Sequence, residues 1–147
     1  MKKLLGLLLL AGFMTVFVGC SSDDDGPAAP QFTIVGTWKV TGKLINNEPQ
    51  DISDICVYKG NMKFVNGGVY VEDVWSEDDE NPCHLEETIG GNWEKNGDSY
   101  TVSITTEGGE SLLPAQFTPI LEQGEINRFK ISATILGTTT TLIFTKQ

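Results

Sequence analysis

Positive charge and histidine are scarce in this chain. Its 147 residues include 20 Asp and Glu but only 10 Lys and Arg, and the one histidine is His84. Nucleic acid binding needs clustered basic side chains that neutralise phosphates, and the sequence has no such cluster. G-x-S-x-G, Walker and dinucleotide-binding fingerprints are absent, and His84 has no evident nucleophile to serve. We therefore expect no nucleic acid partner, no catalytic residues and no enzyme activity.

Long apolar runs are also missing, except at the N-terminus. Residues 4–18 are apolar, follow Lys2 and Lys3, and end at Gly19-Cys20. This run is shorter than the roughly 20 residues that span a bilayer, and no basic flank follows it. An apolar run followed by Gly and Cys resembles the lipobox of bacterial lipoproteins, whose cysteine thiol carries a diacylglycerol. The resemblance implies that residues 1–19 are a signal peptide and that Cys20 is the acylated first residue, anchored to a membrane by its lipid chains, palmitate among them.

The segment after the lipobox, residues 20–31, is small, acidic and rich in proline, so we predict a flexible tether. Its run Asp23-Asp24-Asp25 resembles the export signal of surface-exposed lipoproteins of the Bacteroidetes type. That resemblance implies an outer-membrane protein at the cell surface rather than on the periplasmic face, whereas a solvated spacer is the plainer interpretation. Once the two lysines of the signal leave, 8 basic and 20 acidic residues give a formal charge of −12.

Cysteine is sparse but paired. With Cys20 assigned to the lipid, Cys56 and Cys83 remain, and an exported chain lies in an oxidising compartment, so we predict a disulfide. A zinc site with His84 is the alternative, but adjacent Cys83 and His84 fit none of the usual ligand spacings. The acidic segment 76–87 lacks the pattern of a calcium loop and is predicted to be an exposed loop. We expect no metal and no cofactor besides the lipid anchor.

The body of the chain, residues 32–147, is predicted to be one domain in which apolar residues alternate with polar ones. In the first strand, from Gly36, we expect Trp38, Val40 and Leu44 on one face and Lys39 and Lys43 on the other. Hairpins are predicted at 62–75, 88–105 and 126–145, with turns at 66–68, 95–98 and 137–138. We predict a break at 47–50, a short strand near 56–58, and a strand at 116–121 that Pro119 weakens. In the last hairpin the inward candidates are Phe129, Ile131, Ala133 and Ile135, opposite Thr140, Leu142 and Phe144.

Short strands in sequential hairpins form either a sandwich or an up-and-down barrel. The first strand opens with Gly36-Thr37-Trp38, which matches the G-x-W of lipocalins at the same place. With the hairpins, the domain length and the cysteine pair, the body resembles the lipocalin-like domain of bacterial lipoproteins. The resemblance implies an all-β fold, an up-and-down antiparallel β-barrel of about eight strands. It also implies a basic side chain of the last strand over the tryptophan, for which the chain offers Lys146, while Trp93 repeats the G-x-W form.

A small barrel holds an apolar ligand only when its own side chains leave the interior unfilled. The candidate lining is Met62 and a set of aromatic residues, all of which would equally serve as core: Trp38, Phe64, Tyr70, Trp93, Tyr100, Phe129 and Phe144. We therefore predict an exported, membrane-anchored monomer whose barrel binds a small hydrophobic ligand. The alternative is a structural or interaction head that binds protein or glycan through loops or an edge strand.

Overall fold

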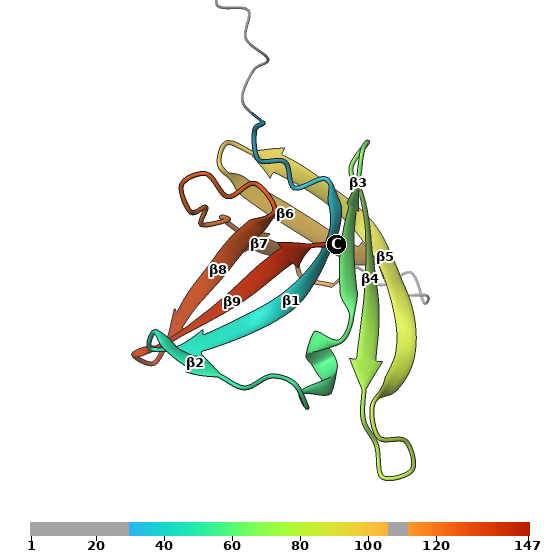
Figure 1. Ribbon diagram of the computed structural model, residues 1–147. Helices are drawn as coiled ribbons and strands as arrows, with labels where there is room; N and C mark the ends of the chain where they lie inside the picture. Colours follow the sequence, from blue (N-terminus) through green and yellow to red (C-terminus); the bar gives the residue numbers. More distant parts are fainter. Residues whose placement is uncertain (1–29, 106–111) are drawn as a thin grey trace, which may run out of the picture.

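The computed structural model describes residues 30–105 and 112–147, so the predicted signal peptide, Cys20 and most of the tether lie outside the described residues (Figure 1). These parts contain a single turn of 3₁₀ helix and strands in the following order: β1 (Gly36–Ile45), β2 (Glu48–Gln50), η1 (Cys56–Tyr58), β3 (Asn61–Val65), β4 (Val69–Ser76), β5 (His84–Asn96), β6 (Ser99–Thr105), β7 (Ala115–Phe117), β8 (Arg128–Ile135) and β9 (Thr138–Lys146). None of the helical structure described there has the length and hydropathy needed to cross a bilayer.

The strands form one antiparallel sheet in the order β7-β6-β5-β4-β3-β1-β9-β8, with β2 paired to β1. Apart from β2, neighbours in the sheet follow one another along the chain except at the junction of β1 with β9, where the two ends of the domain meet. Ile120, just after β7, forms a bridge with Lys130 on β8. The sheet therefore almost closes on itself as an eight-strand up-and-down barrel, and the predicted fold class is confirmed.

The three predicted hairpins are present. The β3–β4, β5–β6 and β8–β9 turns contain glycines with positive φ, namely Gly67 and Gly68, Gly97, and Gly137. This left-handed backbone suits tight hairpin turns and costs glycine no Cβ clash. In the last hairpin Phe129 lies opposite Phe144 as predicted. The predicted inward position of Ile135 is wrong, because this residue lies at the hairpin turn and is 71% exposed.

The predicted face alternation of β1 is wrong in its second half. A β-bulge between Val40 and Gly42 inserts one extra residue into the strand. Beyond it Lys43 pairs with the inward-facing Leu142, and Leu44 moves to the outer face. Because side chains alternate with a period of two, a single extra residue exchanges the two faces for the rest of the strand.

Two short segments after β1 also differ from the prediction. The expected break at 47–50 contains β2, which folds back on β1 through a turn at Asn46 and Asn47, both with positive φ. Pro49 is accommodated there because β2 is an exposed edge strand that needs few backbone donors. The expected strand near 56–58 is the 3₁₀ turn η1.

The boundaries of β5 and β7 differ as well. The predicted loop 76–87 is shorter than expected, because β5 already begins at His84 and pairs back onto Ser76. The predicted strand 116–121 is reduced to β7 and the bridge at Ile120. Pro119, which has no backbone N–H, lies between these two pieces.

The barrel wall is uneven where β1 meets β3. These strands pair only from Gly36 with Phe64 to Lys39 with Asn61. Beyond Lys39, β1 continues alongside β9, and the loop that carries η1 lies between β1 and β4 (Figure 1).

Candidate functional site

The predicted aromatic residues gather at one end of the barrel. Six of them are 0–4% exposed and form what we call the aromatic base: Trp38, Phe64, Tyr70, Tyr100, Phe129 and Phe144. Phe129 packs at 4.8 Å between ring centroids against both Trp38 and Phe144. Phe117, half-buried, bridges the two sides of the base by contacting Phe64 and Phe129. Side chains this buried hold the barrel together, and their role as ligand contacts stays a prediction.

Trp38 closes the aromatic base. Its indole N–H donates a hydrogen bond to the carbonyl oxygen of Ile34 at 2.6 Å, so its one polar atom is satisfied in a fully buried site. The ammonium of Lys146, on the last strand, lies 5.4 Å from the centre of the indole ring. This cation–π contact is the one that the G-x-W resemblance implied.

Trp93, the seventh predicted residue, is only half-buried. Its indole N–H donates to the carbonyl oxygen of Val65 at 2.9 Å, and its ring packs against Phe64 and Tyr100. The tryptophan therefore braces the β3–β4 turn against β5 at the edge of the aromatic base.

One residue of the base, Tyr70, carries a polar group that bonds to a carboxylate. The Tyr70 hydroxyl donates to the Glu72 carboxylate at 2.7 Å. Burial raises the pKa of the Tyr70 phenol well above its ordinary value of 10.0, and the negative charge of Glu72 raises it further. Tyr70 thus stays a hydrogen-bond donor throughout the physiological pH range, and Glu72 shares the inner face because it lies opposite Met62.

Above the aromatic base the interior is lined by smaller apolar side chains. Five inward-facing residues pack on the base but are only partly buried, and we call them the apolar ring: Val40, Met62, Ile104, Ile131 and Leu142. Four of them lie two residues from a base residue on the same strand, namely Val40, Met62, Ile131 and Leu142. Ile104 lies opposite Gly91, which pairs with Tyr70 on its other side. The sequence prediction of the lining included Met62 but not the other four ring residues, although strand alternation already indicated the inward orientation of Val40, Ile131 and Leu142.

Two of the hollows in the described part of the chain lie beside inward-facing residues of the barrel wall. One, of about 620 Å³, lies between β7 and β8 and includes Phe117, Ile120 and Ile131. The other, of about 520 Å³, lies where β1 leaves β3, and we call it the lateral pocket; its lining is Lys39, Val40, Thr41, Ile52, Ser53, Tyr58, Lys59 and Trp75.

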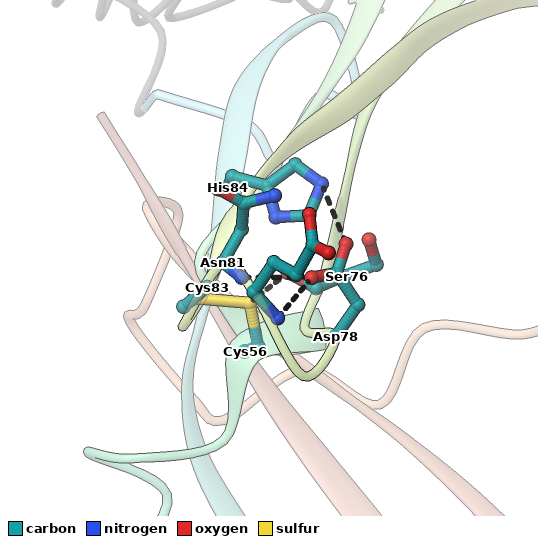
Figure 2. Close-up of polar contacts among 7 residues, drawn as sticks. Cys56, Ser76, Asp78, Asn81, Cys83 and His84 are labelled. Carbon is teal, nitrogen blue, oxygen red and sulfur yellow. Dashed lines mark hydrogen bonds and ion pairs between the residues drawn. A yellow bond between two sulfur atoms is a disulfide. The ribbon is translucent and has the colours of Figure 1, made fainter.

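The predicted disulfide between Cys56 and Cys83 is present, with 5.3 Å between the Cα atoms (Figure 2). It ties η1 to the start of β5, and the Cys56 sulfur lies 3.0 Å from the carbonyl oxygen of Ser76. Both thiols are consumed by this bond, which removes the alternative of a zinc site with His84.

The loop next to the disulfide is ordered by Asp78. Its carboxylate accepts the backbone N–H groups of Glu80 and Asn81 at 2.8 and 2.7 Å (Figure 2). These two donors, chiefly Asn81, hold the pKa of Asp78 below its ordinary value of 3.8. His84 contributes weakly, with its Nε2 atom 3.9 Å from the carboxylate. The arrangement is that of a capped turn.

The fold and interior together define a small antiparallel barrel with a packed base. Residues 34–136 match the lipocalin-like domain family, and the chain belongs to that family. Its members are generally binding proteins rather than enzymes.

Among solved structures, a lipocalin-like protein from Bacteroides uniformis ATCC 8492 is 13% identical with a TM-score of 0.49, and the match covers 77% of this chain and 97% of that one. An uncharacterized protein from Bacteroides eggerthii DSM 20697 is 11% identical with a TM-score of 0.45, covering 77% and 98%. No curated protein sequence matches the chain.

Proposed function

We propose that this protein is an exported, lipid-anchored lipoprotein whose barrel binds a small hydrophobic ligand above the aromatic base. The observation that carries the ligand proposal is the contrast between the two parts of the interior. The base residues are almost fully buried by one another, whereas the apolar ring is only partly buried. Apolar inward-facing surface that the protein does not cover itself is suited to a ligand.

Anchoring through Cys20 is proposed from the sequence of residues 2–20 and from the presence of a disulfide, which suits an exported protein. The measurement is membrane partitioning of the wild-type chain and of Cys20→Ala, together with labelling by an alkyne-bearing fatty acid. Wild type should label and sediment with membranes, and Cys20→Ala should do neither. A Cys20→Ala protein that stays wholly with membranes would refute lipid anchoring through Cys20. Protease accessibility on intact cells then distinguishes the cell surface from the periplasmic face.

Ligand binding is tested by titration with the neutral dye N-phenylnaphthylamine, whose fluorescence rises in apolar sites. Ile104→Trp enlarges one side chain of the apolar ring. It should weaken dye binding about tenfold or more, because a filled interior leaves no room for the dye. Val71→Trp makes a similar enlargement on the outer face of β4, opposite Lys63, and should bind as wild type does. Equal binding by both variants, or no binding by wild type, would rule out the apolar ring as the site.

A second candidate function, an interaction head, is favoured by one observation. Several large apolar side chains are strongly exposed near the ends of β7 and β8, notably Leu113, Ile135 and Leu136 at 95%, 71% and 101%. Such side chains suit contact with a protein partner more than exposure to water. Replacing Ile135 and Leu136 with Ser would abolish partner capture while leaving dye binding intact if this function holds.

A further inference from the structure

The lateral pocket crosses the barrel wall. Val40 lies opposite Phe144 and therefore on the inner face, whereas its neighbours Lys39 and Thr41 lie on the outer face. All three line the same hollow, and Ile52, Tyr58 and Trp75 complete it from the η1 loop and β4. One part of the pocket thus adjoins the interior, and the other opens to solvent.

The charged side chains of this pocket are of one sign. Lys39 and Lys59 line it, and no carboxylate of the described residues does. Neither lysine forms an ion pair within the parts of the chain that the structure describes. The nearby Asp51 carboxylate accepts the backbone N–H of Ser53 and does not belong to the lining. In a chain with twice as many acidic as basic residues, a lining with two ammonium groups and no carboxylate favours a locally positive potential.

The rest of the lining is apolar and aromatic. Val40, Ile52, Tyr58 and Trp75 supply it, and the Lys43 ammonium lies 5.7 Å from the Tyr58 ring, a cation–π contact that orients this wall. We infer that the lateral pocket binds an anionic amphiphile, with a carboxylate or phosphate head group at Lys39 and Lys59 and the apolar part against Val40, Tyr58 and Trp75. The inference rests on the proposed function, because it names the ligand class of the same barrel.

The outer wall of the pocket is held in place before any ligand arrives. The backbone N–H of Lys59 donates to the carbonyl oxygen of Cys56 at 2.9 Å, and the Cys56 sulfur is bonded to Cys83 at the start of β5. Tyr58 and Lys59 are therefore attached to the barrel by the disulfide. A wall that is already ordered loses less conformational entropy on binding than a free loop does.

The test compares two dyes of nearly the same shape on the purified full chain. Anilinonaphthalene sulfonate carries a negative charge, and N-phenylnaphthylamine lacks it. Lys39→Gln and Lys59→Gln should each weaken binding of the sulfonate dye about two- to fivefold, the range for a partly exposed charge pair, and the double variant about tenfold. Binding of the neutral dye should not change, which also shows that the variants are folded. Raising salt from about 0.05 to about 0.5 M should weaken sulfonate binding by wild type and have little effect on the double variant.

Lys63→Gln is the matched control. Lys63 lies on β3, opposite Thr37 of β1, and does not line the pocket. The same loss of charge at this position should therefore leave the binding of both dyes unchanged. Displacement of the sulfonate dye by dodecanoate, dodecyl phosphate and dodecanol then separates the two possible head groups from a neutral one. Equal displacement by dodecanol, or sulfonate dye binding that does not change in the lysine variants, would overturn the inference that the ligand is anionic. Binding of the neutral dye would in that case still support the proposed function. Failure of wild type to bind either dye would overturn both.

Discussion

Removing the disulfide should cost this small barrel much of its stability. Cys56 and Cys83 are separated by 27 positions in the sequence, and the loop between them contains β3, β4 and both loops that flank them. The chain-entropy relation for a cross-link that closes a loop of this length gives about 3.5 kcal/mol at room temperature. Because a domain of this size is typically stable by only about 5–15 kcal/mol, that loss is a large fraction of the total.

The assay is urea unfolding of wild type and of the Cys56→Ala/Cys83→Ala variant, followed by tryptophan fluorescence. With an m value of about 2 kcal/mol/M, the loss of about 3.5 kcal/mol lowers the midpoint by about 1.8 M. Dithiothreitol provides the matched control, because it should lower the urea midpoint of wild type to that of the variant and leave the midpoint of the variant unchanged. A difference below about 1 kcal/mol, or a wild type that is indifferent to the reductant, would refute the idea that the bond constrains the unfolded chain.

Three further predictions concern the base and the capped turn. Phe129→Ala, which removes a ring that is 1% exposed and packed between Trp38 and Phe144, should lower the free energy of unfolding by about 3–5 kcal/mol in urea; a loss under about 1 kcal/mol would contradict close packing there. Lys146→Ala should cost about 0.5–1 kcal/mol and Lys146→Arg much less, because only the latter keeps a cation over the indole; equal losses would argue against the cation–π contact. The depressed pKa of Asp78 means that its contribution to stability is present above the unfolded value near 3.8 and is lost as pH falls through the lower folded value. The loop should therefore become protease-sensitive only in that acidic range, and Asp78→Asn should remove this pH dependence; a loop that resists protease at every pH would refute it.

The hairpins could be predicted because their signals are local. Asn66-Gly67-Gly68 and Gly137 mark turns, and strand alternation on either side of Gly137 already places Phe129 opposite Phe144. Closure of the barrel depends instead on contacts between distant parts of the sequence. Pairing of Trp38 with Lys146 joins residues from opposite ends of the domain, and nothing in either segment alone specifies the partner, so only the G-x-W resemblance indicated it.

The lining of a candidate site is harder to predict than a hairpin, because hydrophobicity alone does not distinguish core from lining. Large aromatic side chains are the obvious candidates for a cavity in a sequence, yet here they fill the base, at 0% exposure for Trp38 and 1% for Phe129. Whether an inward residue is covered depends on how many neighbours reach it across the barrel. That depends on shear and strand length, and the alternation of one strand contains neither quantity.

The lateral pocket arises from three irregularities that a period-two pattern cannot represent. The bulge after Val40 turns Lys43 inward toward Tyr58, the β1–β3 ladder ends at Lys39, and the disulfide fixes a 3₁₀ turn where a strand was expected. Each interrupts regular sheet structure and each contributes to the same hollow. Departures from local sequence rules are commonest where a chain gives up regularity for function. Their convergence beside Lys39 and Lys59 makes this side of the barrel the better place to look for a ligand than the base that the aromatic residues indicate.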